Sequence, residues 1–142
     1  MKTFTIIKRG YTLLVILFFA LTINQVNAQD KKIEKAESKF CTSVVDFIQS
    51  LEALDKANEG SDVDKFNKAY KTADKAWNKL VKRAYKLENV EIKEGVKAYN
   101  NIVDEVNKIG NGTKSGENTD KIAKHINKSV STFNQIIGPI CN

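Results

Sequence analysis

The most regular pattern in the chain runs from Ser61 to Leu87, where apolar positions alternate with lysines. Steps of three and four residues separate the apolar positions, which is the period of one face of an α-helix. These positions are Val63, Phe66, Tyr70, Ala73, Trp77, Leu80, Ala84 and Leu87. Ser61 is expected to cap the helix, with Asp64 placed to complete a capping box. The pattern predicts a helix over 61–88 whose apolar stripe the other helices cover.

The segment before it shows the same period and predicts a first helix over 31–58. Its stripe consists of Ile33, Phe40, Val44, Phe47, Ile48, Leu51 and Leu54. Gly60 is expected to end this helix in the left-handed conformation that helix stops often use. Because the connection to the next helix is very short, the two helices should pack as antiparallel neighbours.

Two more helices are predicted in the second half of the chain, over 91–109 and 119–137. Gly95 lies on the apolar face of the first of them, where two backbones are expected to approach closely. The glycine-rich polar segment 110–118 between them reads as a loop. The dipeptide that begins at Gly138 holds the chain's one proline and should close the last helix.

No proline or glycine marks the boundary between the second and third helices. A single helix over 61–109 would leave nothing folded back on it, so a break near Asn89 is expected on packing grounds. Four helices joined by short turns and one longer loop predict an all-α, up-down-up-down four-helix bundle. A faint echo, Lys68-Ala69-Tyr70 and Lys97-Ala98-Tyr99, is compatible with a duplicated helix or with chance in a limited alphabet.

The first 28 residues have the organisation of a secretory signal peptide. Three basic residues and no acid lie in them, followed by an apolar run from Tyr11 to Ile23 and a compact Val26-Asn27-Ala28 cleavage pattern. The run is short of the roughly 20 residues that a bilayer span needs. We therefore expect cleavage near Ala28, no stable membrane span afterwards, and a secreted or periplasmic protein over 29–142; an uncleaved anchor is the alternative.

Two cysteines, Cys41 and Cys141, lie in the expected exported portion. In an oxidising compartment an even pair most simply forms a disulfide. The bundle topology brings both chain ends to one end of the bundle, which places Cys41 within reach of the C-terminal tail. The pattern predicts a Cys41–Cys141 disulfide, with two free thiols as the alternative.

Charge is distributed unevenly along the chain. The net charge of +6 includes three positive charges in the expected signal peptide, so the remainder is only mildly basic and does not indicate a nucleic-acid partner. One face of the 61–88 helix is strongly cationic, which suits an anionic envelope surface or an acidic protein. Its possible contact residues are Lys68, Lys75, Lys79, Lys82, Arg83 and Lys86.

Candidate chemistry is sparse, so we expect no catalytic residue, no cofactor and no metal site. His125 is the single histidine, and no nucleophile accompanies it. The C-x-x-C-H pattern for covalent haem is absent, which leaves a haem held by His125 alone as the remaining haem alternative. No Glu-x-x-His pair supports a di-metal carboxylate site. Asn111 and Asn127 match the glycan-acceptor pattern.

These features together predict an exported helical bundle that binds another macromolecule as an inhibitor, immunity-type or envelope accessory protein, and not an enzyme. One alternative is a carrier of a small apolar ligand, with Tyr70, Trp77 and Tyr99 near the cavity. A purely structural envelope protein is the other.

Overall fold

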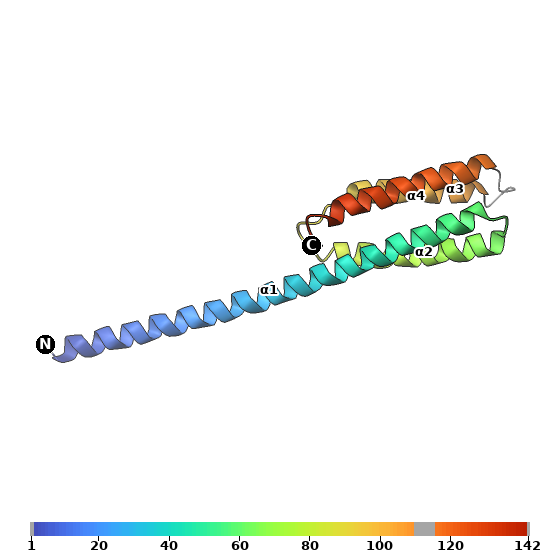
Figure 1. Cartoon of the computed structure of the whole chain (residues 1–142). Helices are drawn as coiled ribbons and strands as arrows, with labels where there is room; N and C mark the ends of the chain where they lie inside the picture. Colours follow the sequence, from blue (N-terminus) through green and yellow to red (C-terminus); the bar gives the residue numbers. More distant parts are fainter. Residues whose placement is uncertain (1, 110–115, 142) are drawn as a thin grey trace. The chain divides into compact units, whose positions relative to one another are not determined.

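A computed structural model of the chain describes the backbone of residues 2–109 and 116–141, and the side chains of residues 28–109 and 117–141. This part of the chain is helical and contains no strand (Figure 1). Its helices are α1 (Lys2–Glu59), α2 (Val63–Ala84), α3 (Lys93–Ile109) and α4 (Gly116–Ile137). The all-α fold class predicted from the hydrophobic period is confirmed.

The chain divides into two compact units, Met1–Lys35 and Ala36–Asn142. The first unit is helical from Lys2 onward as part of α1. The predicted start of the first helix at residue 31 is therefore not a helix boundary, because the backbone keeps its helical conformation through this position. The predicted end at residue 58 is one residue from the observed end at Glu59.

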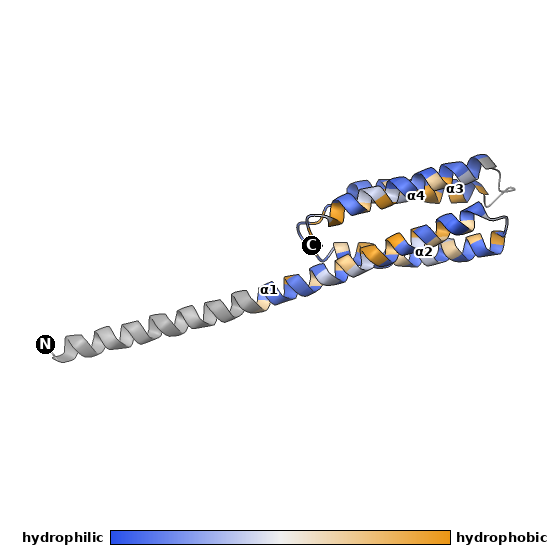
Figure 2. Ribbon diagram, viewed as in Figure 1, coloured by the Kyte–Doolittle hydropathy of each residue, from blue (hydrophilic) through white to orange (hydrophobic). Residues whose placement is uncertain are grey.

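The second unit holds the bundle. The part of α1 from Ala36 and α2 form one antiparallel hairpin, and α3 and α4 form a second hairpin that packs against it (Figure 1). Both hairpins contribute apolar residues to one buried core, and the ribbon of each hairpin carries orange, hydrophobic positions (Figure 2). This is the predicted up-down-up-down arrangement.

Four aromatic rings, one from each helix, meet in the interior of the bundle. Phe47 lies against Trp77, Tyr99 and Phe133, with ring centroids 5.3, 5.4 and 5.3 Å away. The rings of Trp77 and Tyr99 are stacked at 4.6 Å. Such contacts add to the stabilisation that comes from burying the rings. Below we call Phe47, Trp77, Tyr99 and Phe133 the aromatic cluster.

Gly95 makes room for the aromatic cluster. A Cβ atom at this position would overlap the ring of Phe133. The prediction of a close approach at Gly95 locates the right residue, but the neighbour is an aromatic side chain, where a second backbone was expected. Because Gly95 has no side chain, the bulky Phe133 ring fits between α3 and the rings of α1 and α2.

The ends of α2 differ from the sequence-based expectation. The capping residue is Asp62, one position later than Ser61: its backbone is extended, and its carboxylate accepts a hydrogen bond of 3.1 Å from the backbone N–H of Lys65. The helix ends at Ala84, four residues before the predicted end, with Tyr85 as its C-cap. The predicted break before α3 is present, since residues 85–92 form the connection.

The end of α1 also differs from the prediction. No glycine among the described residues has a positive φ, so Gly60 does not adopt the left-handed conformation. The helix ends one residue before Gly60, and the capped start of α2 follows within a few residues. The change of direction therefore uses right-handed or extended backbone throughout.

The predicted disulfide is confirmed. Cys41 on α1 and Cys141 after α4 are bonded, with 5.7 Å between their Cα atoms and a sequence separation of 100 residues. The described residues contain no free cysteine. A bond of this kind fits an exported protein, because reducing compartments disfavour it.

Candidate interaction face

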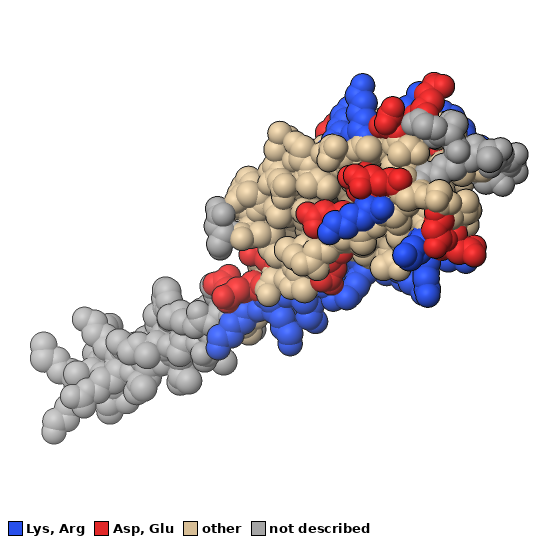
Figure 3. Space-filling model, turned by 45° about the vertical axis from the view of Figure 1, so that its right-hand side comes forward, with Lys and Arg blue, Asp and Glu red and all other residues tan. Residues whose placement is uncertain are grey.

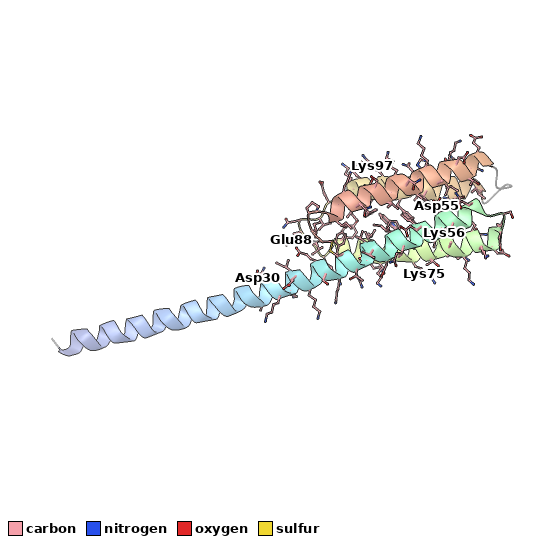
Figure 4. All side chains as sticks on the ribbon, in the orientation of Figure 1. Asp30, Asp55, Lys56, Lys75, Glu88 and Lys97 are labelled. Carbon is pink, nitrogen blue, oxygen red and sulfur yellow. A yellow bond between two sulfur atoms is a disulfide. The ribbon has the colours of Figure 1, made fainter. Side chains whose placement is uncertain are left out.

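The outward side of α2 carries a line of lysines. Lys68, Lys75, Lys79 and Lys82 on α2 and Lys86 just beyond its end are all exposed, and we call these five residues the α2 lysine face. Lys71 is exposed along the same side. In Figure 4 the labelled Lys75 projects away from the bundle, on the side opposite to Lys97 of α3. Basic side chains also project along the lower edge of the bundle in Figure 3.

Arg83 was predicted to belong to this face, but the structure places it differently. It is half-buried, and its guanidinium donates a hydrogen bond of 2.5 Å to the backbone carbonyl oxygen of Lys39 on α1. Its position on the helix lies toward the α1 side, so this side chain ties the two helices together. The outward surface therefore contains lysines and no arginine.

The one acid between Lys65 and Lys86 does not neutralise the α2 lysine face. Asp74 is half-buried, and its carboxylate accepts hydrogen bonds from the Tyr99 hydroxyl at 3.2 Å and from the Asn78 amide at 3.3 Å. The Asp74 carboxylate therefore lies at the boundary between α2 and α3. Tyr99 is only 2% exposed, and burial together with the nearby Asp74 carboxylate raises the pKa of its hydroxyl well above the ordinary value.

Among the described residues, Lys79 is the one member of the α2 lysine face with a carboxylate partner. Its Nζ atom lies 3.7 Å from a carboxylate oxygen of Asp46 on α1, and both side chains are about half exposed. An ion pair of this kind contributes little to folding, because solvent screens it. Within the described parts of the chain, Lys68, Lys75, Lys82 and Lys86 are exposed and form no ion pair, although Asp64 lies one turn before Lys68 on α2.

A second group of polar residues lies inside the bundle, and the sequence analysis did not identify it. Glu105 is 7% exposed, and one of its carboxylate oxygens accepts a hydrogen bond of 2.7 Å from Lys108. This hydrogen bond, with the positive charges of Lys108 and Lys121, lowers the pKa of Glu105. The other oxygen has no hydrogen-bond partner among the described residues. Its spacing from Ile102 and Ile109 places Glu105 on the apolar stripe, and that spacing was the available signal.

Asp55 and Asn58 lie near the same end of the bundle, on α1. The Asn58 amide donates a hydrogen bond of 2.9 Å to the backbone carbonyl oxygen of Thr119, which joins α1 to the beginning of α4. Burial, with the neighbouring Glu59 charge, raises the pKa of Asp55. One Asp55 oxygen is buried without a hydrogen-bond partner among the described residues.

The residues proposed to surround an apolar ligand fill the interior themselves. Trp77 stacks on Tyr99, and Tyr70 lies close enough to Tyr99 to help raise the pKa of the Tyr99 hydroxyl. These are the equivalent tyrosines of the Lys-Ala-Tyr echo, so the two copies meet in space. A ligand carried between the helices would have to separate these rings.

The remaining candidate residues are dispersed. His125 is half-buried on α4, and the described residues include no group of three or more His, Cys, Asp or Glu arranged to hold a metal ion. Asn127 is exposed on α4, whereas Asn111 lies outside the described residues. Three glutamates are paired with nearby lysines on their own helices: Glu94 with Lys97, Glu105 with Lys108, and Glu117 with Lys121.

Comparisons of the chain with protein-family models, with curated proteins and with solved structures found no match. In the portion of the chain that the structure describes, none of the helices combines the length and the apolar character needed to cross a bilayer. Function is therefore inferred from the chain's own surface chemistry.

Proposed function

We propose that this chain is an exported helical bundle that acts by binding another macromolecule, without catalysis, and that it makes the contact through the α2 lysine face. The observation that carries this proposal is a charge imbalance along α2: four exposed lysines lie on the helix and Lys86 just beyond it, whereas Asp64 in the first turn and Asp74 are its two acids, and Asp74 is hydrogen-bonded to Tyr99 at the α2–α3 boundary. An anionic envelope surface or an acidic protein would complement that side.

Export is the first part of the proposal. The disulfide supports it, as does the signal-peptide organisation of residues 1–28 in the sequence. The intact mass of the protein recovered outside the cytoplasm tests it. We expect the mass of residues 29–142, lower by two hydrogens than that of the reduced chain. A chain that retains residues 1–28 would contradict signal cleavage.

Binding through the α2 lysine face is the second part. We expect the wild-type protein to sediment with the envelope fraction at low salt, and a variant with Lys68, Lys75, Lys82 and Lys86 changed to Gln to remain in the supernatant. These four positions are chosen because none has a carboxylate partner among the described residues, so folding should be unaffected.

The matched control removes the same charge from the other three helices. Lys56, Lys93, Lys124 and Lys128 are all exposed and lie on α1, α3 and α4. Changing these four to Gln should leave the protein in the envelope fraction. If both quadruple variants leave the envelope to the same extent, the partner responds to total charge and the assignment to the α2 lysine face is wrong.

A further inference from the structure

We infer that the partner of the α2 lysine face is the headgroup surface of an anionic lipid bilayer, which the bundle contacts peripherally with α2 lying along the membrane plane. This inference deepens the proposed function and depends on it. Four features of the described residues carry it: the length and shape of the face, the choice of lysine, an exposed tyrosine at its end, and the burial of the opposite side of α2.

The α2 lysine face is long, narrow and convex. Lys68 and Lys82 are 14 positions apart, which corresponds to about 21 Å along α2, and Lys86 follows in the turn beyond Ala84. The four lysines on α2 follow one side of the cylinder at helical spacing. A plane of headgroups can touch such a convex line along its whole length, whereas a globular acidic partner would need a matching groove.

Lysine suits a diffuse layer of charge. Its ammonium group is a compact, strongly hydrated charge on a flexible stem, whereas arginine provides the planar, bidentate contacts of stereospecific recognition. The basic residues on the outward side of α2 are all lysines, since the guanidinium of Arg83 is hydrogen-bonded to α1. Attraction of lysines to an anionic bilayer needs no fixed geometry, and it decays over the screening length of the salt solution.

Tyr85 adds an exposed aromatic ring at the C-terminal end of α2. It is 83% exposed, the highest value among the exposed large apolar side chains, and it lies in the chain between Lys82 and Lys86. Tyrosine prefers the interface between water and lipid, because its ring is apolar and its hydroxyl is polar. An exposed tyrosine near lysines therefore suits a bilayer surface, where the ring and the ammonium groups can both reach the headgroup region.

The opposite side of α2 prevents deeper insertion. Phe66, Ala73 and Leu80 are buried in the bundle core, and Trp77 belongs to the aromatic cluster. Insertion of this stripe into lipid would require the bundle to open. The contact is therefore peripheral and should be reversed by salt.

Vesicle flotation with the purified, disulfide-bonded protein in its exported form tests the inference. The vesicles consist of phosphatidylcholine alone or of a 1:1 mixture with phosphatidylglycerol. We expect flotation with the mixed vesicles at 50 mM NaCl, release at 500 mM NaCl, and no flotation with phosphatidylcholine. Equal binding to vesicles of both compositions, or binding that does not depend on the salt concentration, would overturn the inference.

Variants locate the contact. Each lysine near an anionic surface is expected to change the partition coefficient by about fivefold. The partition coefficient should therefore fall by on the order of 100- to 1000-fold in the variant that replaces Lys68, Lys75, Lys82 and Lys86 with Gln. The same four residues changed to Arg should keep it, and Tyr85→Ser should lower it by a smaller factor. The Lys56, Lys93, Lys124 and Lys128 control should float more strongly than the α2 variant. Equal losses in the two Gln variants would overturn the inference.

The vesicle and envelope results together separate the two proposals. If envelope retention depends on the α2 lysine face but pure lipid vesicles do not bind, the partner is an acidic macromolecule, and the lipid inference fails while the proposed function stands. If neither envelope nor vesicles bind, both fail. Circular dichroism and an intact disulfide on each variant verify that its fold is retained.

Discussion

The two ends of the bundle are held together by different chemistry. At one end a covalent bond joins Cys41 of α1 to Cys141 beyond α4. At the other end the same two helices are joined by the hydrogen bond from Asn58 to the Thr119 carbonyl, and Asp55 nearby has a buried oxygen without a described partner. The first end holds even when packing fluctuates, whereas the second depends on polar groups that water competes for.

This difference indicates where the fold should open first. Local opening exposes regions with few apolar contacts and incompletely satisfied polar groups at lower free energy than the core. We therefore expect amide hydrogens around Asn58 and Thr119 to exchange faster than those around Cys41, with the aromatic cluster slowest of all.

Removing the disulfide should have the largest effect. The chain-entropy model gives a stabilisation of roughly 4–5 kcal/mol for a closed loop of about a hundred residues. Changing both Cys41 and Cys141 to Ser should lower the free energy of unfolding by an amount of this order, measured by urea titration. Reduced wild-type protein provides the matched comparison and should unfold at the same urea concentration as the variant. An unchanged midpoint would show that packing alone closes this end.

Adding one methyl group beside the aromatic cluster should come next. Alanine favours a helix more than glycine does by about 1 kcal/mol, but a Cβ at Gly95 would overlap the Phe133 ring, which is itself held by Phe47 and Trp77. We expect Gly95→Ala to destabilise the protein by about 1–3 kcal/mol, measured by thermal and urea unfolding.

Two controls accompany Gly95→Ala. At Gly138 a Cβ atom would make only an ordinary contact with the Asn134 carbonyl oxygen, so Gly138→Ala should be nearly neutral. Combining Gly95→Ala with Phe133→Leu should cost less than the sum of the two single changes, because the smaller side chain relieves the overlap. Full additivity would refute the proposed contact.

Shortening Asn58 should loosen the hydrogen-bonded end. Asn58 is 1% exposed, so Asn58→Ala leaves the Thr119 carbonyl without this donor and should cost about 1–2 kcal/mol. Hydrogen exchange should accelerate at the beginning of α4 and not near Cys141. The matched control is Asn78→Ala, since Asn78 is exposed and bonds within its own helix; its effect should stay within about 0.5 kcal/mol. Similar losses in both variants would count against a special role for Asn58.

Asp55→Asn should have the smallest effect, in the opposite direction. Folding raises the pKa of Asp55 above its ordinary value of 3.8, so the folded state favours the protonated carboxyl. That contribution to stability is present below the ordinary pKa and is lost as the pH rises through the raised value. Asparagine resembles the protonated form, so the variant should be slightly more stable than wild type at pH 7, by about 0.5 kcal/mol or less.

Unfolding of the Asp55→Asn variant and the wild type across the pH range checks the sign. The difference between them should shrink as the pH falls through the raised pKa of Asp55 toward its ordinary value of 3.8, because the wild-type carboxyl then becomes protonated too. A variant that is less stable than wild type at pH 7 would mean that the charged Asp55 carboxylate has a favourable partner.

The sequence was sufficient for the helices, their order and the disulfide, because these follow from a strong periodic signal. Apolar residues at three- and four-residue steps, such as Phe66, Ala73 and Leu80, are buried as expected. The disulfide followed from topology, since four antiparallel helices bring the tail back to Cys41. Which residue caps α2 was missed, because Ser61 and Asp62 are both good capping residues and differ by only one position.

Other features depend on tertiary packing, which a periodic pattern does not specify. The Phe133 ring beside Gly95, and the donation from Arg83 to α1, each join residues far apart in the chain. Arg83 was assigned to the α2 lysine face because basic residues are usually solvated, yet its position on the helix lies toward α1. The burial of Glu105 could have been predicted from the sequence, because its three-residue spacing from Ile102 places it on the buried stripe.

The disulfide has a mechanical consequence. If the chain were pulled by attachments before Cys41 and after Cys141, tension would pass directly through the two sulfur atoms. α2, α3 and α4 would then lie off the load-bearing path and remain folded under force. Reduction would return about a hundred residues to that path, and the molecule could lengthen by on the order of 300 Å at 3.3–3.6 Å per residue.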